Sequence, residues 1–321
     1  MRRLTRRELA LMLGVGALAG TARGGPWKPP TRPGVVGLAD ARVPLGEELG
    51  PERARHAMAG ALAASVGAES SQAAAAALFT ANDTVGIKVN CLAGKNMSPR
   101  VELVEALVDL IAGAGVDRRR IIVFERSDRE LRRAGFTFRQ QGPPYRCIGT
   151  NNDYDSQPSS SGAIGSCFAR MVSTTCTALV SFGVVKDHDL SGVSAGMKNW
   201  YGVIHNPNKY HDNGCDPYIS DVARHPFIRD KLRVTVLDGV VAQCHGGPAY
   251  RHGATFELGK VVASTDPVAA DLWALREIEA ERAKRGMSTL EAAGRPARFL
   301  TTAEEAGLGI ADPGKLLLVT G

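Results

Sequence analysis

The chain has 321 residues, of which 44% are hydrophobic and 22% are charged, and its formal net charge is +6. This composition is typical of a folded globular protein and excludes a disordered chain. Residues 1–25 hold five of the arginines against one acidic residue, so the remainder has only 34 basic and 32 acidic residues. So small an excess argues against nucleic acid as a partner bound through bulk charge.

The first 25 residues have the pattern of an export signal. They combine an arginine-rich start, a short apolar run over residues 9–19 and small residues near the end. The run is too short to cross a membrane, so we expect no stable membrane span. The sequence T-R-R-E-L at residues 5–9 resembles the twin-arginine signal, whose cargo crosses the membrane folded; an arginine-rich ordinary secretory leader is the alternative. We predict a signal peptide over 1–25, the twin-arginine translocation machinery as a partner, and a periplasmic or secreted protein.

Residues 26–83 separate this leader from the main pattern of the chain. Residues 26–50 are rich in proline and glycine and show no apolar periodicity, which predicts an extended segment. Residues 51–80 are rich in alanine, the residue with the highest helix propensity, and predict helix.

A strand, a helix and a second strand are predicted next. TVGIKVNCL at 84–92 and RIIVFER at 120–126 are short β-branched runs, and residues 98–115 place apolar side chains at helical spacing, with Ser98 as the expected N-cap. Such a unit implies parallel strands joined by a right-handed crossover.

The remaining elements repeat this pattern. Strands are predicted at 177–185, 233–241 and 260–265, a long helix at 266–285 with Asp266 at its N-terminus, and a short helix and final strand in the tail. The fold class is therefore α/β, with a mainly parallel central sheet flanked by helices and a ligand site at the carboxyl edge of the strands.

The cysteines and glycines exclude several common cofactors. Six cysteines occur without a C-x-x-C pair, so there is no iron–sulfur cysteine motif; Cys147 and Cys167 could form a disulfide across a polar loop, or all six could be free buried thiols. No G-x-G-x-x-G follows the first strand and no P-loop is present, so there is no nucleotide motif.

Polar residues follow several of the predicted strands. Lys88 and Asn90 end the first strand, and residues 186–188 (K-D-H) follow the strand at 177–185. Asp238 lies in or just beyond RVTVL, the first part of the strand predicted at 233–241, and Asp266 follows KVVAST, the strand predicted at 260–265. Because ligands bind beyond the carboxyl ends of parallel strands, these side chains are candidates for one site.

The order of the motifs resembles that of the domain-of-unknown-function 362 family. G-I-K-V-N, R-I-I-V, V-V-K-D-H, G-M-K-N-W-Y-G, V-L-D-G, G-G-P and S-T-D-P-V-A-A-D follow one another between about residues 84 and 285. The resemblance implies an α/β domain of this type over 84–321 with a shared polar site. Some members carry ferredoxin-like iron–sulfur segments, which this chain lacks.

The stretch at 194–217 concentrates the chemistry. Lysine suits carboxylate or phosphate, and asparagine can orient a ligand oxygen. We predict substrate binding by Lys88, Asn90, Lys186, Asn199 and Tyr201. The predicted catalytic residues are His188, Lys198 and His205.

A metal site is a further hypothesis for the same region. Neutral imidazole is the commonest metal ligand in proteins, and carboxylates could complete the shell. The candidate ligands are His205, His211, Asp238 and Asp266, for a divalent or transition metal of unknown identity. No short zinc motif is present, so the ligands would have to assemble over long range.

These observations lead to alternative functions. One is an exported, metal-dependent oxidoreductase acting on a small anionic molecule, which the export signal favours over a metal-assisted hydrolase or isomerase. The other is a non-catalytic periplasmic protein that binds a metal or an anionic solute.

Overall fold

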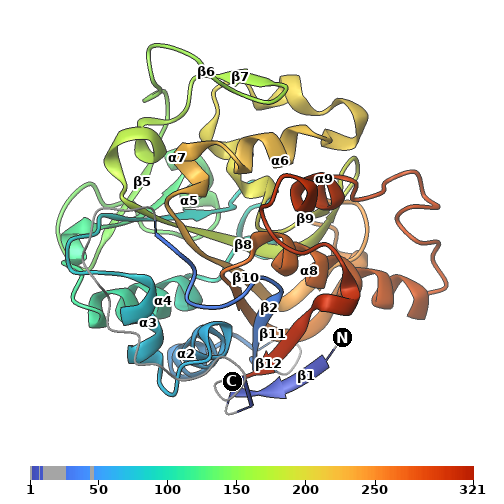
Figure 1. Ribbon diagram of the computed structural model, residues 1–321, viewed down its shortest axis with the longest axis horizontal. Coiled ribbons are helices and arrows are strands. Elements are labelled where there is room, and N and C mark those ends of the chain that lie inside the picture. The colour runs from blue at the N-terminus through green and yellow to red at the C-terminus, as the bar shows by residue number, and fades with distance from the viewer. Residues whose placement is uncertain (1, 7, 10–26, 44–46) are drawn as a thin grey trace.

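The computed structural model describes residues 2–6, 8–9, 27–43 and 47–321. Its central feature is a ten-stranded sheet in the order β1-β12-β2-β11-β10-β8-β3-β4-β5, with β9 paired to β8 off this path (Figure 1). The strands of this sheet are β1 (Arg2–Thr5), β2 (Val35–Asp40), β3 (Val85–Val89), β4 (Ile121–Glu125), β5 (Arg146–Gly149), β8 (Ala178–His188), β9 (Gly192–Ser194), β10 (Leu232–Gln243), β11 (Thr255–Ser264) and β12 (Leu317–Thr320). A separate hairpin joins β6 (Ser159–Ser161) to β7 (Ile164–Ser166).

The strands β10, β8, β3, β4 and β5 run parallel to one another, and of the described strands only the short β9 beside β8 is antiparallel in this half of the sheet. β3, β4 and β8 are buried along their whole length, which explains why their sequences are continuous apolar runs rather than alternating ones. The helix α4 (Val101–Gly113) connects β3 to β4, as the strand–helix–strand pattern predicts. The α/β fold class is confirmed.

β11 runs antiparallel to both of its neighbours, β10 and β2. Only eleven residues, 244–254, separate β10 from β11. So short a connection returns the chain as an antiparallel partner, since a parallel one needs a longer crossover. The carboxyl end of β11 therefore lies at the opposite edge of the sheet from that of β10, with Ser264 beside Thr235.

Helices cover both faces of the sheet (Figure 1). One apolar core joins the sheet to α2, α3 and α4, and another joins it to α6, α8 and α9. The helices besides α4 are α2 (Pro51–Val66), α3 (Ser71–Leu78), α5 (Asp128–Arg133), α6 (Tyr218–Ala223), α7 (Pro226–Arg229), α8 (Pro267–Lys284) and α9 (Phe299–Glu305). None of the helices in the described ranges is long and apolar enough to cross a membrane.

The region before residue 84 contributes to this sheet. Residues 35–40, in the segment predicted to be extended, form β2 between β12 and β11. The alanine-rich segment forms two helices, because Gly67 adopts a left-handed conformation (φ 66°) that ends α2. Of the predicted signal peptide, Arg2–Thr5 pair with β12, whereas most of the apolar run at 9–19 lies outside the described residues.

One of the two predicted helix caps is formed, and no disulfide links the cysteines. Asp266 caps α8 as predicted, accepting a hydrogen bond from the Ala269 amide (2.9 Å). The Ser98 cap is wrong: α4 begins later, after Arg100, and the Ser98 hydroxyl donates to the Gly94 carbonyl. All six cysteines are free thiols, so the Cys147–Cys167 bridge is not formed.

Candidate functional site

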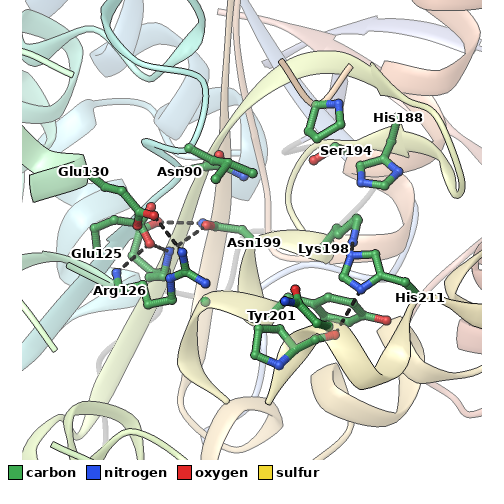
Figure 2. A pocket seen from close by; sticks show the side chains of 16 residues that line it. Asn90, Glu125, Arg126, Glu130, His188, Ser194, Lys198, Asn199, Tyr201 and His211 are labelled. Atoms are coloured by element: carbon green, nitrogen blue, oxygen red, sulfur yellow. Dashed lines mark hydrogen bonds and ion pairs between the residues drawn. The ribbon is translucent and has the colours of Figure 1, made fainter. Parts of the chain in front are cut away.

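A pocket of about 290 Å³ opens at the carboxyl ends of β8, β3 and β4, three adjacent parallel strands. Figure 2 shows carboxylates and an arginine on one side of it, and a lysine and imidazoles on the other. The lining residues are Lys88, Asn90, Leu92, Glu125, Arg126, Glu130, His188, Ser194, Lys198, Asn199, Tyr201, Gly202, Pro207, Asn208, His211 and Pro248.

A buried ion pair forms one wall of the pocket. The Lys88 ammonium lies 2.6 Å from Glu125 Oε1, and it also donates to the Asn199 side chain (3.1 Å) and to the Val89 carbonyl (2.7 Å). Glu125 accepts two more hydrogen bonds, from the backbone amides of Cys91 and Arg126. Every charge in this network is therefore paired, as burial requires.

Lys88 and Asn199, predicted as substrate ligands, are both engaged within this wall. All three ammonium hydrogens of Lys88 have protein acceptors, and the Asn199 amide donates to the Lys88 carbonyl (2.7 Å) and to Ser181 (3.1 Å). Gly202, the last glycine of G-M-K-N-W-Y-G, lies against the Lys88 side chain, since a Cβ at Gly202 would be 2.8 Å from Lys88 Nζ. This part of the motif shapes the wall of the pocket.

Lys198 and His211 form the opposite side of the pocket. Lys198 begins a 3-10 helix (Lys198–Val203), and its ammonium lies 3.3 Å from His211 Nε2 and 4.0 Å from the centre of the Tyr201 ring. His211 Nδ1 is 3.0 Å from the Pro207 carbonyl, to which it donates, so Nε2 carries a lone pair facing the lysine. Burial lowers the pKa of Lys198 to about 8 and also lowers that of His211.

His188 presents a hydrogen-bond donor. Its Nδ1 accepts from the backbone amides of Leu190 (3.1 Å) and Ser191 (3.3 Å), so the proton of the neutral ring resides on Nε2. Burial, and to a smaller extent the charge of Lys198, lowers the pKa of His188 to about 2. The ring is therefore neutral at physiological pH, and its Nε2 has a hydrogen to donate.

Lys186 is a second buried cation behind the pocket. Its side chain is fully buried at the end of β8, and its ammonium makes a long hydrogen bond of 3.4 Å to Asn90, which lines the pocket. The adjacent Asp187 does not neutralise it directly, because that carboxylate binds Arg295 (2.8 Å) and the Gly247 amide (2.9 Å). Desolvation lowers the pKa of Lys186 to about 8.

The predicted metal ligands do not come together. Of the four, only His211 lines the pocket. His205 is exposed; outside the pocket its Nδ1 accepts from the Cys167 amide (3.2 Å) and lies 3.1 Å from the Ser166 hydroxyl. Within the described ranges of the chain, no three histidine, cysteine or acidic side chains are grouped so that they could hold a metal ion.

The two aspartates of that predicted set have structural partners. Asp238 lies inside β10 rather than beyond it, and its carboxylate binds the Arg100 guanidinium (2.7 Å) and amide (2.9 Å). Asp266 accepts from the amides of Gly34 and Ile310 while capping α8. It is far from the pocket because β11 is antiparallel, which places its carboxyl end at the other edge of the sheet.

Asp271 on α8 holds the segment that leads into Lys198. It is fully buried, and its carboxylate accepts from the amides of Gly196 (2.7 Å) and Met197 (3.0 Å). Desolvation raises the pKa of Asp271 to about 7.

We expect Asp271→Ala to lower the free energy of unfolding by about 2–4 kcal/mol, because two buried amides lose their acceptor. Asp271→Asn keeps one acceptor oxygen and should cost less. Chemical denaturation measures both values. Equal midpoints for Asp271→Ala and the wild type would show that the carboxylate does not support this segment.

The sequence-based prediction did not include five charged or polar lining residues: Glu125, Arg126, Glu130, Ser194 and Asn208. The rule that selected Lys88 and Asn90 would also have selected Glu125, since it is the last residue of β4. Arg126 pairs with Glu130 one helical turn later (2.8 Å), a contact typical of i, i+4 neighbours.

Comparisons with known proteins place this site within a family. The family model "Domain of unknown function (DUF362)" matches residues 85–276, more than half of the chain. The chain belongs to the DUF362 family. All residues that line the pocket lie within the matched segment of this DUF362 protein.

Similarity to individual known proteins is weak or absent. No curated protein matches the sequence. A crystal structure of a Thermotoga maritima protein, determined by the Northeast Structural Genomics Consortium, is similar to this DUF362 protein with 10% identity and a TM-score of 0.44. The similarity covers 75% of this chain and spans 60% of the length of that one.

Proposed function

We propose that this protein binds a small carboxylate or phosphate compound in the pocket and catalyses proton transfer to or from that compound. The observation that carries the proposal is the charge balance. Lys88 is paired with Glu125 and Arg126 with Glu130, whereas Lys186 and Lys198 have no carboxylate partner among the described residues. One buried ammonium group lines the pocket and a second lies behind it beside Asn90; together they favour an anion in the pocket, because an opposite charge compensates the loss of water around them.

The surrounding groups suit proton transfer. His188 can donate a hydrogen bond from Nε2 to an anionic oxygen, while His211 Nε2 can exchange a proton with Lys198 over 3.3 Å. A lysine whose pKa is about 8 serves as an acid or a base near neutral pH far better than an exposed lysine. Asn90 can orient the ligand beside Lys186.

This arrangement favours metal-independent isomerisation or hydrolysis over metal-dependent oxidation. The lone pair of His188 Nδ1 is already bonded to two amides, and that of His211 Nε2 faces an ammonium group. Neither ring thus offers a vacant lone pair to a cation in this arrangement. A periplasmic or secreted location remains part of the proposal and depends on the arginine-rich leader alone.

Calorimetric titration with inorganic phosphate and with acetate tests the proposed site. We expect Lys198→Met to weaken binding at least about tenfold, or roughly 1.4 kcal/mol, because half of the uncompensated charge is removed. Lys209→Met, which removes an exposed lysine from the neighbouring 3-10 helix (Pro207–Tyr210), should bind like the wild type.

The same titration should depend on pH in a defined direction. Lys186 and Lys198 lose their protons as the pH rises through about 8, so wild-type affinity should fall between pH 7 and 9.5. Lysines at their ordinary pKa would hold the affinity up to pH 10. Equal binding by Lys198→Met and the wild type would rule out this pocket, and saturable binding without turnover of any substrate would make the protein a binder.

A further inference from the structure

We propose that Lys198 is a nucleophile that forms a Schiff base with the carbonyl carbon of a small anionic aldehyde or keto acid. The inference rests on the proposed function, because the anionic group would bring the carbonyl to the pocket. It narrows the substrate class from any small anion to one that also carries an aldehyde or ketone.

The contacts of the pocket lysines single out Lys198. Lys88 also lines the pocket, but all three of its ammonium hydrogens are bonded to protein acceptors. Lys186 is fully buried and does not line the pocket. Lys198 lines the pocket, and its ammonium lies beside His211 Nε2 and the Cys215 thiol, with no carboxylate partner among the described residues.

His211 is placed to activate the amine. Its Nδ1 hydrogen is bonded to the Pro207 carbonyl, which leaves the Nε2 lone pair 3.3 Å from the ammonium. When Nε2 takes a proton from Lys198, the neutral amine can attack the carbonyl carbon. A base within hydrogen-bond distance of a lysine that is desolvated near a second cation is a recurring arrangement for such nucleophiles.

The step balances with water as the only by-product. A C–N bond forms as the carbonyl π pair moves to oxygen, and the protonated His211 returns its proton to that oxygen. Transfer of a further proton from nitrogen to the same oxygen releases water. The nitrogen lone pair then forms the C=N bond. The nitrogen keeps its last hydrogen, so the product is a protonated imine. The Tyr201 ring, 4.0 Å from the nitrogen, would face this cation and favour it.

Burial supports the same assignment. A lysine with a pKa of about 8 holds on the order of a hundredfold more free amine at pH 7 than one at its ordinary value. Lys209, which is exposed, provides a comparison in the same protein.

Reductive trapping tests the proposal. The folded protein is incubated at pH 7 with glyoxylate, pyruvate or glyceraldehyde 3-phosphate, reduced with sodium cyanoborohydride, digested and analysed by mass spectrometry. We expect a stable adduct on Lys198 at least about tenfold more abundant than on the exposed Lys209, because His211 Nε2 lies 3.3 Å from the Lys198 nitrogen and can take its proton. Lys198→Arg should show no adduct at this position, and His211→Gln should slow its formation at pH 7 while a higher pH restores it.

Two further results separate the possible failures. If calorimetry without the reductant shows that the three carbonyl compounds bind but no adduct forms on Lys198, the Schiff base is wrong while the anion site stands. If phosphate binds but the three carbonyl compounds do not, the Schiff base is wrong while the anion site stands. If neither phosphate nor the carbonyl compounds bind, both are wrong. Labelling spread equally over Lys198 and the exposed lysines would also overturn the inference, since it would show ordinary amine reactivity. A His211→Gln variant that is labelled at the wild-type rate would remove His211 from the step.

Discussion

Glu125→Gln should lower the free energy of unfolding by about 3–5 kcal/mol, the range found when one partner of a buried ion pair is removed. Glu125 and Lys88 are both almost fully buried, 2.6 Å apart, and each has further hydrogen bonds within the wall of the pocket. Glutamine leaves the Lys88 charge uncompensated. The glutamine side chain would also place its amide hydrogens against one of the donors that now bond to Glu125, so that two donors face each other.

Urea denaturation followed by circular dichroism measures this change, and the chain offers a matched control. Asp109 and Arg118 form an ion pair of similar length, 2.7 Å, but both side chains are well exposed. Asp109→Asn should therefore cost less than about 1 kcal/mol. Adding Lys88→Met to Glu125→Gln should restore part of the loss, since it removes the stranded charge. If Glu125→Gln costs no more than Asp109→Asn, the buried pair is not a support of the site.

Lys186→Met should stabilise the protein while weakening anion binding. The Lys186 side chain is fully buried, its only polar contact among the described residues is a 3.4 Å hydrogen bond to Asn90, and its pKa is lowered from 10.5 to about 8. A shift of this size corresponds to roughly 3 kcal/mol of unfavourable charge burial, which a methionine of similar length does not incur.

The gain should depend on pH. Below pH 8 the lysine is charged in both the folded and the unfolded chain, so the advantage of methionine is present in full. Between about pH 8 and 10.5 the folded protein releases this proton and the unfolded chain retains it, so the advantage shrinks. Lys231→Met is the control, because the Lys231 ammonium is bonded to the Val172 and Ser173 carbonyls and its loss should destabilise.

Denaturation at pH 7 and pH 9.5, together with phosphate titration, measures both effects. A Lys186→Met variant that is less stable than the wild type at pH 7 would mean that the lysine is satisfied inside the protein. Of the two buried lysines, only Lys198 would then favour an anion in this pocket.

Local sequence was sufficient to predict part of the site. Lys198, Tyr201 and His211 fall within one short polar stretch, and the pocket contains all three. His188 and Asn90 were predicted because parallel strands bring their carboxyl ends to one edge, and β8 and β3 are neighbours in the sheet. His205 belongs to the same stretch but bonds with Ser166 outside the pocket, since adjacency in sequence does not determine the direction of a side chain.

The amino-acid sequence by itself determined several of the strands and helices, the α/β class and the order of the motifs. Those features depend on apolar periodicity and on residues close together along the chain. Only the tertiary structure decided that Lys88 pairs with Glu125 and that β11 directs Asp266 to the opposite edge of the sheet. Both outcomes depend on the direction and order of strands in the sheet. These are set by packing between distant segments, which leaves no local pattern in the residues themselves.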